Sequence, residues 1–138
     1  MSQTLVDQYN KMCENSLISH LQITFTEIGE DYVVAEMPVQ PIVYQPFGLL
    51  HGGASVVLAE SLGSLLSNKL IDNEKFMAVG QNIEAHHLRS KKSGKVKGKA
   101  IIIKAGRTSH LVKIEITDEE EKLISYSHLT NAIIPKNL

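Results

Sequence analysis

The sequence predicts an α+β fold in which one antiparallel sheet wraps around a long central helix. Three observations support this prediction. Residues 52–71 form a long helical pattern whose apolar side chains recur on nearly every side, which is typical of a buried helix. Two strand-like runs precede this segment, and three or four long runs follow it in hairpin succession. A helix of this kind must pack on one face of a single sheet.

The elements before the central helix are short. Residues 4–13 and 16–21 have the spacing of two short helices, and Asn15 is a candidate cap for the second. Residues 23–28 and 32–37 are rich in apolar and β-branched side chains, and Gly29-Glu30-Asp31 between them predicts a hairpin. Pro38 and Pro41 end the second strand, so residues 39–50 are expected to be a loop that leads to the helix.

The segments after the helix predict consecutive antiparallel strands at residues 76–90, 95–104, 109–117 and 122–134. Residues 91–94, 106–108 and 118–121 between them have the composition of turns. Such a sheet is open, and its edge strands need covering or pairing, so oligomerisation is expected.

The composition is that of a single globular domain spanning residues 1–138. The chain is 43% hydrophobic and 21% charged, with a formal net charge of −1, so nothing favours nucleic acid as a partner. No apolar run approaches the roughly 18 residues of a membrane span, and the N-terminus lacks the pattern of a signal peptide. We therefore expect a cytoplasmic protein without a membrane partner. With Cys13 as the single cysteine, and His86 and His87 on opposite faces of a strand, no metal site and no cofactor are predicted.

Two features of the central helix carry chemistry. Glu60 lies in its apolar middle with no Lys or Arg within one turn, where a carboxylate is costly unless it is hydrogen-bonded or protonated. Gly52 lies at the helix start, where the first amides are unpaired and carry the positive end of the helix dipole. Such amides stabilise a developing oxyanion, and a glycine lets a substrate approach closely.

The stretch Gln45-Pro-Phe-Gly-Leu-Leu-His-Gly-Gly-Ala-Ser-Val-Val-Leu-Ala-Glu60 resembles the signature of hotdog-fold acyl-CoA thioesterases of the PaaI-like type. The resemblance covers nearly the whole chain. It is strongest to the subgroup that includes 1,4-dihydroxy-2-naphthoyl-CoA hydrolase and the proofreading thioesterase of the enterobactin pathway. It implies hydrolysis of an acyl-CoA to a free acid and CoA, with an aromatic or medium-length acyl group. A role in menaquinone biosynthesis is one possibility within this subgroup.

The resemblance also assigns roles to individual residues. Glu60 acts as nucleophile or as general base on water, and the two roles remain open. The Gly52 amide is the oxyanion donor, Gln45 and His51 orient the thioester or the attacking water, and Ser64, at i+4 from Glu60, positions the carboxylate or the water.

Binding of the rest of the substrate is expected on two later segments. One is the strand that carries Gly80, His87, Leu88, Arg89 and Ser90, with Glu84 and His86 where many members have asparagine. The other is the turn after the next strand, where the resemblance places the CoA nucleotide and pantetheine arm, on Lys104, Gly106, Arg107, Thr108 and Ser109. Candidates to line the acyl pocket are Phe47, Leu49, Leu50 and Met77.

Helix geometry favours a site shared between two chains. Gly52 and Glu60 are eight residues apart, or about 12 Å along a helix axis, whereas one reacting carbon must lie about 3 Å from both groups. The resemblance likewise implies a homodimer with shared active sites and a dimer of dimers. Two alternatives stay open: a hotdog hydratase or dehydratase, and a non-catalytic acyl-CoA-binding module, since a fold does not fix a function.

Overall fold

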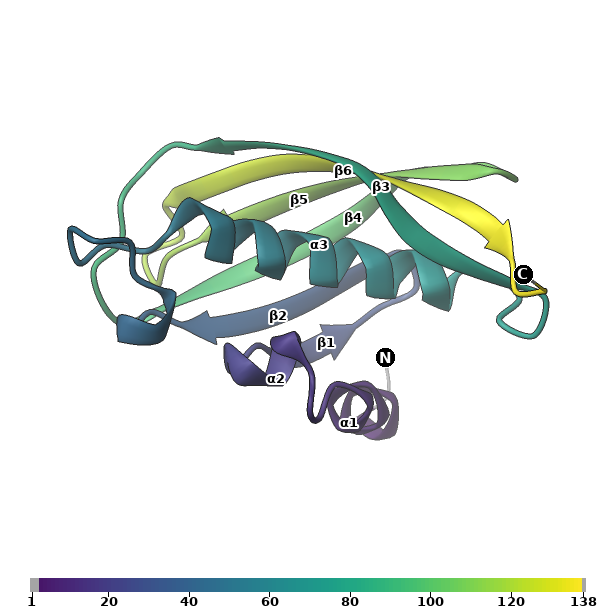
Figure 1. Cartoon of the computed structure of the whole chain (residues 1–138), viewed down its shortest axis with the longest axis horizontal. Helices are drawn as coiled ribbons and strands as arrows, with labels where there is room; N and C mark the ends of the chain where they lie inside the picture. Colours follow the sequence, from purple (N-terminus) through teal and green to yellow (C-terminus); the bar gives the residue numbers. More distant parts are fainter. Residues whose placement is uncertain (1–2, 138) are drawn as a thin grey trace.

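The computed structural model describes residues 3–137 and confirms the predicted α+β architecture. Six antiparallel strands form one curved sheet in the order β1-β2-β4-β5-β6-β3, and helix α3 (Gly52–Lys69) crosses one face of it (Figure 1). The strands are β1 (Thr24–Ile28), β2 (Tyr32–Pro38), β3 (Phe76–His87), β4 (Lys95–Ala105), β5 (Ser109–Thr117) and β6 (Leu123–Pro135). This is the arrangement that the hotdog resemblance implied.

Three short helical elements precede α3: α1 (Gln3–Met12), α2 (Leu17–His20) and the 3-10 turn η1 (Pro41–Val43). Helix α1 packs beside the edge strand β1 (Figure 1). Helix α2 begins differently from the prediction, because Ser16 is its N-cap and its side chain accepts from the Ile18 N–H. Asn15 lies before the cap in the left-handed region, with φ of 60°.

The core lies between α3 and the sheet. Leu58, Leu62 and Leu66 are fully buried, and burial of each leucine side chain contributes about 1.5–3 kcal/mol. The helix and the sheet approach closely because each carries a glycine at the contact: a Cβ on Gly63 would lie 2.5 Å from Leu129 Cδ2, and one on Gly98 would lie 2.5 Å from Leu62 Cδ1.

The expectation that α3 is buried on every side is wrong for the single chain. The sheet covers one face, and its buried residues follow the pairs 54–55, 58–59, 62–63 and 66–67. The opposite face, with Val57, Glu60, Ser64 and Leu65, is half-buried. The apolar residues of this face border a groove between α3 and the two N-terminal helices. Within residues 3–137 they do not pack into a second hydrophobic core.

Two details of β3 place it against the helix. The strand ends at His87, three residues before the predicted end, because the chain then leaves the sheet and Leu50 donates to the Lys91 carbonyl at 2.8 Å. This contact brings residues 88–91 to the loop before α3. The pairing of β3 with β6 also shifts register between Gly80 and Asn82, so Gln81 forms a bulge. This bulge lies beside the middle of α3.

Candidate active site

The Glu60 carboxylate lies directly on the backbone of strand β3. A Cβ built on Gly80 would lie 2.4 Å from Glu60 Oε2 and 3.2 Å from its Cδ. Gly80 therefore leaves the space that the carboxylate occupies. The β-bulge at Gln81 follows at once, and bulges are common next to active sites, where they redirect a strand. Gly80 was predicted to bind substrate, and the structure places it against the Glu60 carboxylate.

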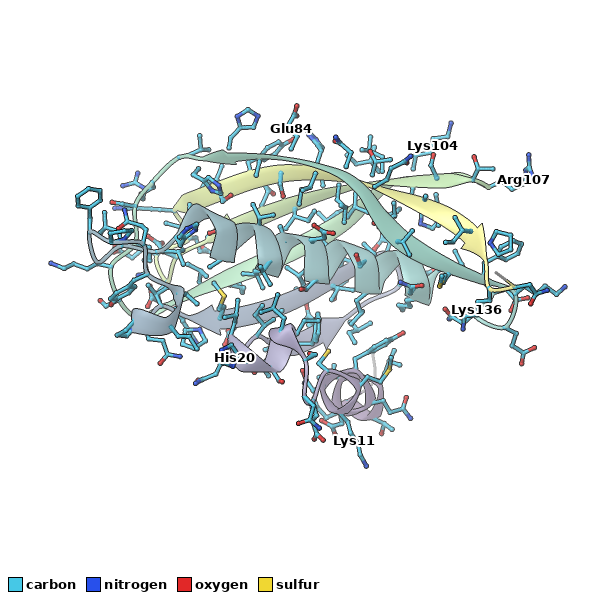
Figure 2. The ribbon with its side chains drawn as sticks, in the orientation of Figure 1. Lys11, His20, Glu84, Lys104, Arg107 and Lys136 are labelled. Carbon is cyan, nitrogen blue, oxygen red and sulfur yellow. The ribbon has the colours of Figure 1, made fainter. Side chains whose placement is uncertain are left out.

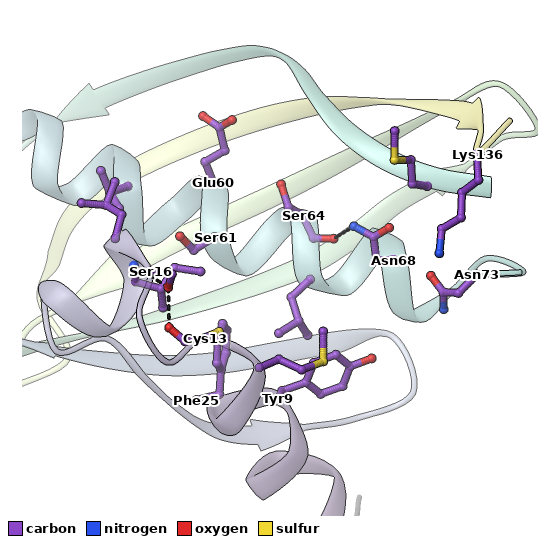
Figure 3. A pocket seen from close by; sticks show the side chains of 16 residues that line it. Tyr9, Cys13, Ser16, Phe25, Glu60, Ser61, Ser64, Asn68, Asn73 and Lys136 are labelled. Atoms are coloured by element: carbon purple, nitrogen blue, oxygen red, sulfur yellow. Dashed lines mark hydrogen bonds between the residues drawn. The ribbon is translucent and has the colours of Figure 1, made fainter. Parts of the chain in front are cut away.

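Glu60 borders a largely apolar groove of about 730 Å³. Figure 3 shows Glu60, Ser64 and Asn68 along one side of α3, above α1 and α2. The predicted acyl-pocket residue Met77 also lines this groove, whereas Phe47 is 87% exposed and Leu49 and Leu50 lie elsewhere. The remaining lining residues come from α1, α2, α3, β1 and the segments next to β3 and β6: Tyr9, Met12, Cys13, Ser16, Leu17, Ile18, Phe25, Val57, Ser61, Leu65, Asn73 and Lys136.

The start of α3 presents one unpaired amide. His51 is the N-cap, and its Nδ1 accepts a 2.7 Å hydrogen bond from the Gly53 N–H. The neutral His51 ring then carries its proton on Nε2. The Gly52 N–H has no hydrogen-bond partner among residues 3–137, so it remains available at the positive end of the helix dipole.

A second pocket, of about 340 Å³, lies in front of this amide. The Gly52 backbone touches the ring of His87, since a Cβ there would lie 2.7 Å from His87 Nε2. His87 Nδ1 is held 3.2 Å from Ser125 Oγ. Gln45 is also present, and its Oε1 accepts from the Phe47 N–H at 2.5 Å. The structure thus brings together the predicted residues Gln45, Gly52, His87, Leu88, Arg89 and Ser90, with Leu49, Leu50, Ser55 and Ile124.

The predicted CoA contacts of the β4–β5 turn lie at the other end of the helix. Gly106, Arg107 and Thr108 line a third pocket, of about 670 Å³, together with Leu70 and Ile71 that follow α3. Figure 2 shows Lys104 and Arg107 at this end of the sheet, and Ser109 begins β5 there. In one chain the turn and the segment from His87 to Ser90 therefore line two separate pockets.

Glu60 and Gly52 also line different pockets of the chain. His51 is exposed next to Gly52, and Ser64 lies one turn beyond Glu60 in the groove. No pocket described within residues 3–137 contains both the carboxylate and the unpaired amide. The expectation, from helix geometry, that the two groups of one site come from two chains stays a prediction.

Sequence reasoning missed two sets of polar contacts. Asn68 bonds to the backbone of β3, and Ser67, His110 and Asn131 form a buried cluster between α3 and the sheet. Burial lowers the pKa of His110. The available signal was the adjacent polar pair Ser67 and Asn68 near the end of a largely apolar helix. The strand partners of these residues depend on the three-dimensional register, which no local pattern gives.

Two further properties bear on function. Among residues 3–137 no cluster of three or more His, Cys, Asp or Glu side chains is arranged to hold a metal ion. None of the helices described has the length and apolar character needed to cross a membrane.

The curved six-stranded sheet around the long helix α3 defines a hotdog-fold protein. Residues 47–125 match the Thioesterase superfamily. A 1,4-dihydroxy-2-naphthoyl-CoA hydrolase from Escherichia coli is 43% identical over 129 residues, which cover 94% of this chain and 94% of the relative. The chain belongs to the thioesterase superfamily and is a thioester hydrolase.

Solved structures agree with this assignment. A thioesterase from Haemophilus influenzae matches with a TM-score of 0.92 and 43% identity, covering 96% of this chain and 92% of that chain. A mutant thioesterase from Pseudomonas aeruginosa matches with a TM-score of 0.92 and 41% identity, covering 94% of each chain. The central sheet and helix of this chain are therefore those of hotdog thioesterases.

Proposed function

We propose that this protein hydrolyses an acyl-CoA thioester to a free acid and CoA, with Glu60 of one chain and the Gly52 amide of a second chain acting on the same carbonyl. The observation that carries the proposal is the placement of the Glu60 carboxylate on the bare backbone of Gly80, inside an apolar groove.

Hydrolysis at such a site requires a donor for the oxyanion and a group that activates or replaces water. The unpaired Gly52 N–H is the donor, because it points outward from the helix start and makes no other bond within residues 3–137. Glu60 either takes a proton from water, which attacks the carbonyl carbon, or attacks it directly to give an anhydride that water then cleaves. In both routes the C–S bond breaks and the CoA thiolate leaves.

Two chains supply one site in this proposal. Strand β3 is an edge strand, and most of its side chains from Val79 to His87 are exposed. An exposed edge of this length favours pairing with another strand. A second copy of the chain, paired across this edge by a two-fold axis, supplies its own helix start. We infer a homodimer in which each site takes Glu60 from one protomer and Gln45, His51 and Gly52 from its partner.

The acyl group is proposed to be aromatic and to enter the groove beside Glu60. Its volume, about 730 Å³, lies within the range of about 300–1,000 Å³ usual for small-molecule sites. Val57, Leu65 and Met77 supply apolar walls. The name of the Escherichia coli relative makes 1,4-dihydroxy-2-naphthoyl-CoA the first candidate substrate. The CoA moiety then extends along His87, Arg89 and Ser90.

Thiol release from a panel of acyl-CoAs tests the proposal. The panel comprises 1,4-dihydroxy-2-naphthoyl-, benzoyl-, phenylacetyl- and aliphatic CoA, each measured with the wild type and with Glu60→Gln. We expect an aromatic acyl-CoA to have the highest kcat/KM. We also expect Glu60→Gln to lower kcat by at least about 100-fold, since an acid–base group contributes about 10²–10⁴-fold, with substrate binding retained.

Other outcomes identify the alternatives. Binding without thiol release from any acyl-CoA favours a binding module, and hydration of an enoyl-CoA without thiol release favours a hydratase. Full activity in Glu60→Gln contradicts the catalytic role of Glu60. In a single turnover in ¹⁸O-labelled water, label in the Glu60 side chain shows that an anhydride formed and that water cleaved it at the Glu60 carbonyl carbon.

A further inference from the structure

Asn68 joins helix α3 to strand β3 through two hydrogen bonds, and a third bond holds its side chain to the helix. Its Oδ1 accepts from the Ala78 N–H at 2.9 Å, and its Nδ2 donates to the Ala78 carbonyl at 3.1 Å. The same Nδ2 donates to the Ser64 carbonyl one turn back at 2.9 Å, a bond drawn in Figure 3. One carboxamide thus binds both backbone groups of a strand residue and is itself fixed to the helix.

These bonds fall on the outer edge of the sheet. Strand β3 pairs with β6 on one side, and no strand within residues 3–137 pairs with it on the other. Ala78 is nevertheless only 7% exposed, and buried backbone groups without partners are strongly unfavourable. Asn68 therefore takes the place of a neighbouring strand at this single residue.

Asn68 and Glu60 lie on the same side of α3, since residues four and eight positions apart recur on one helix face. Their contacts on β3 also lie close together: Asn68 holds Ala78, and Glu60 lies on Gly80 two residues further along. The bulge at Gln81 begins directly beyond. The bonds to Ala78 consequently fix the strand at a point next to the backbone on which the carboxylate lies.

We propose that Asn68 is a positioning residue for the reaction: by holding Ala78, it sets β3 against α3 and so holds the Glu60 carboxylate in its reactive place on Gly80. This proposal rests on the proposed role of Glu60. In the proposed reaction Asn68 itself touches no reacting atom. Small displacements matter at such a site, because a shift of about 1 Å in a reacting group can lower a rate by about 100-fold.

Substitution of Asn68 tests the proposal. Asn68→Leu keeps the approximate shape and removes all three bonds, while Asn68→Asp keeps an acceptor for the Ala78 N–H and loses the donors. We expect Asn68→Leu to lower kcat about tenfold or more, with KM changed by less than about threefold, and Asn68→Asp to fall between it and the wild type. The matched control is Lys69→Ala, which removes the bond from Lys69 Nζ to the Glu30 carbonyl near the opposite edge of the sheet and should leave kcat unchanged.

A double-mutant cycle separates positioning from a merely structural role. If Asn68 acts through Glu60, Asn68→Leu should change the residual kcat of Glu60→Gln by less than about twofold, because residues that act as a unit are not additive. Amide hydrogen exchange at Ala78 provides a readout independent of activity and should become faster in Asn68→Leu. An equal loss of kcat in both backgrounds, or wild-type kcat despite faster exchange at Ala78, overturns the proposal.

The same experiments keep the two proposals apart. Wild-type activity in Glu60→Gln contradicts the proposed function itself, whatever the Asn68 variants do. Loss of activity in Glu60→Gln together with wild-type kcat in a folded Asn68→Leu or Asn68→Asp contradicts the positioning role alone.

Discussion

Gly80 leaves the space in which the Glu60 carboxylate lies. A methyl group there would lie 2.4 Å from Oε2, far inside van der Waals contact. The clash falls on the end of a flexible side chain, so the carboxylate can rotate away while the sheet and helix stay where they are. A substitution at Gly80 is therefore expected to affect the reaction much more than the stability of the fold.

Gly80→Ala is predicted to lower kcat by at least about tenfold, because displacement of a reacting group by about 1 Å is enough for a larger loss. The free energy of unfolding should change by less than about 1 kcal/mol, as is common for substitutions outside the core. Steady-state thiol release and urea unfolding measure the two quantities. Lys75→Ala, at an exposed position just before β3, is the control. Unchanged kcat in a folded Gly80→Ala protein would mean that Glu60 does not act from its place on Gly80.

At the level of residues, sequence reasoning could propose Glu60 and Gly52 as candidates because each depends on local context. A single acid within an apolar helical pattern and a glycine pair at a helix start are both visible in the sequence. The relation of Glu60 to Gly80, and that of Asn68 to Ala78, depends on how β3 lies against α3. That alignment arises from long-range packing and a β-bulge, so neither relation can be read from local sequence.

At the level of elements, the two edge strands of the sheet share one feature: on each, an asparagine side chain from a helix bonds both backbone groups of one strand residue. On β1, Asn10 Nδ2 donates to the Phe25 carbonyl at 2.9 Å, and the Phe25 N–H donates to Asn10 Oδ1 at 2.8 Å. On β3, Asn68 makes the same pair of bonds to Ala78. In each case a helix supplies one carboxamide that replaces a missing strand, and the bonded strand residue is buried.

Asn10→Leu is predicted to lower the free energy of unfolding by about 1–3 kcal/mol, the loss of two hydrogen bonds at about 0.5–1.5 kcal/mol each. The physical reason is that Phe25, 1% exposed, keeps buried backbone groups that lose their partners. Urea unfolding measures the stability, and amide exchange at Phe25 should become faster. Lys11→Ala, at the next and exposed position, should leave both unchanged. An equal stability of Asn10→Leu and the wild type would show that α1 does not depend on these bonds.

Most elements could be predicted because their periodicity is local. The helix pattern at 52–71 and the strand runs after it correspond to α3 and β3 to β6 within a few residues. The differences have tertiary causes: β3 ends early because residues 88–91 turn toward Leu50. The half-buried face of α3 could not be predicted, since an apolar groove wall and an apolar core give the same sequence pattern.

At the level of the whole molecule, one chain does not assemble the proposed site. The carboxylate and the unpaired amide line different pockets, and the segment from His87 to Ser90 lines a pocket separate from that of the Gly106 turn. The exposed edge of β3 offers a surface on which a second copy can pair. If two copies pair there, a chain that lacks the Gly52 amide and a chain that lacks the Glu60 carboxylate should together form an active site. Mixing two such variants measures this.

Gly52→Pro and Glu60→Gln are the two variants for this measurement. Proline is favoured at the first position of a helix and removes the amide donor, and the extended His51 backbone, with φ −70° and ψ 131°, is compatible with a following proline. The proline also displaces the His87 ring of the same chain, because a Cβ at residue 52 would lie 2.7 Å from His87 Nε2. Each variant alone should have little activity. When the two are refolded together in equal amounts, half of the dimers should be mixed, and each mixed dimer should hold one intact site and one doubly defective site.

The mixture should therefore recover about one quarter of the wild-type activity per chain, as random pairing in a two-fold dimer requires. Recovery should fall on dilution if dimers dissociate, and the same samples in analytical ultracentrifugation report the dimer fraction. A site built within one chain predicts no recovery above the sum of the two variants, because each chain then keeps its own defect. Recovery near one quarter thus requires Glu60 and the Gly52 amide to come from different chains.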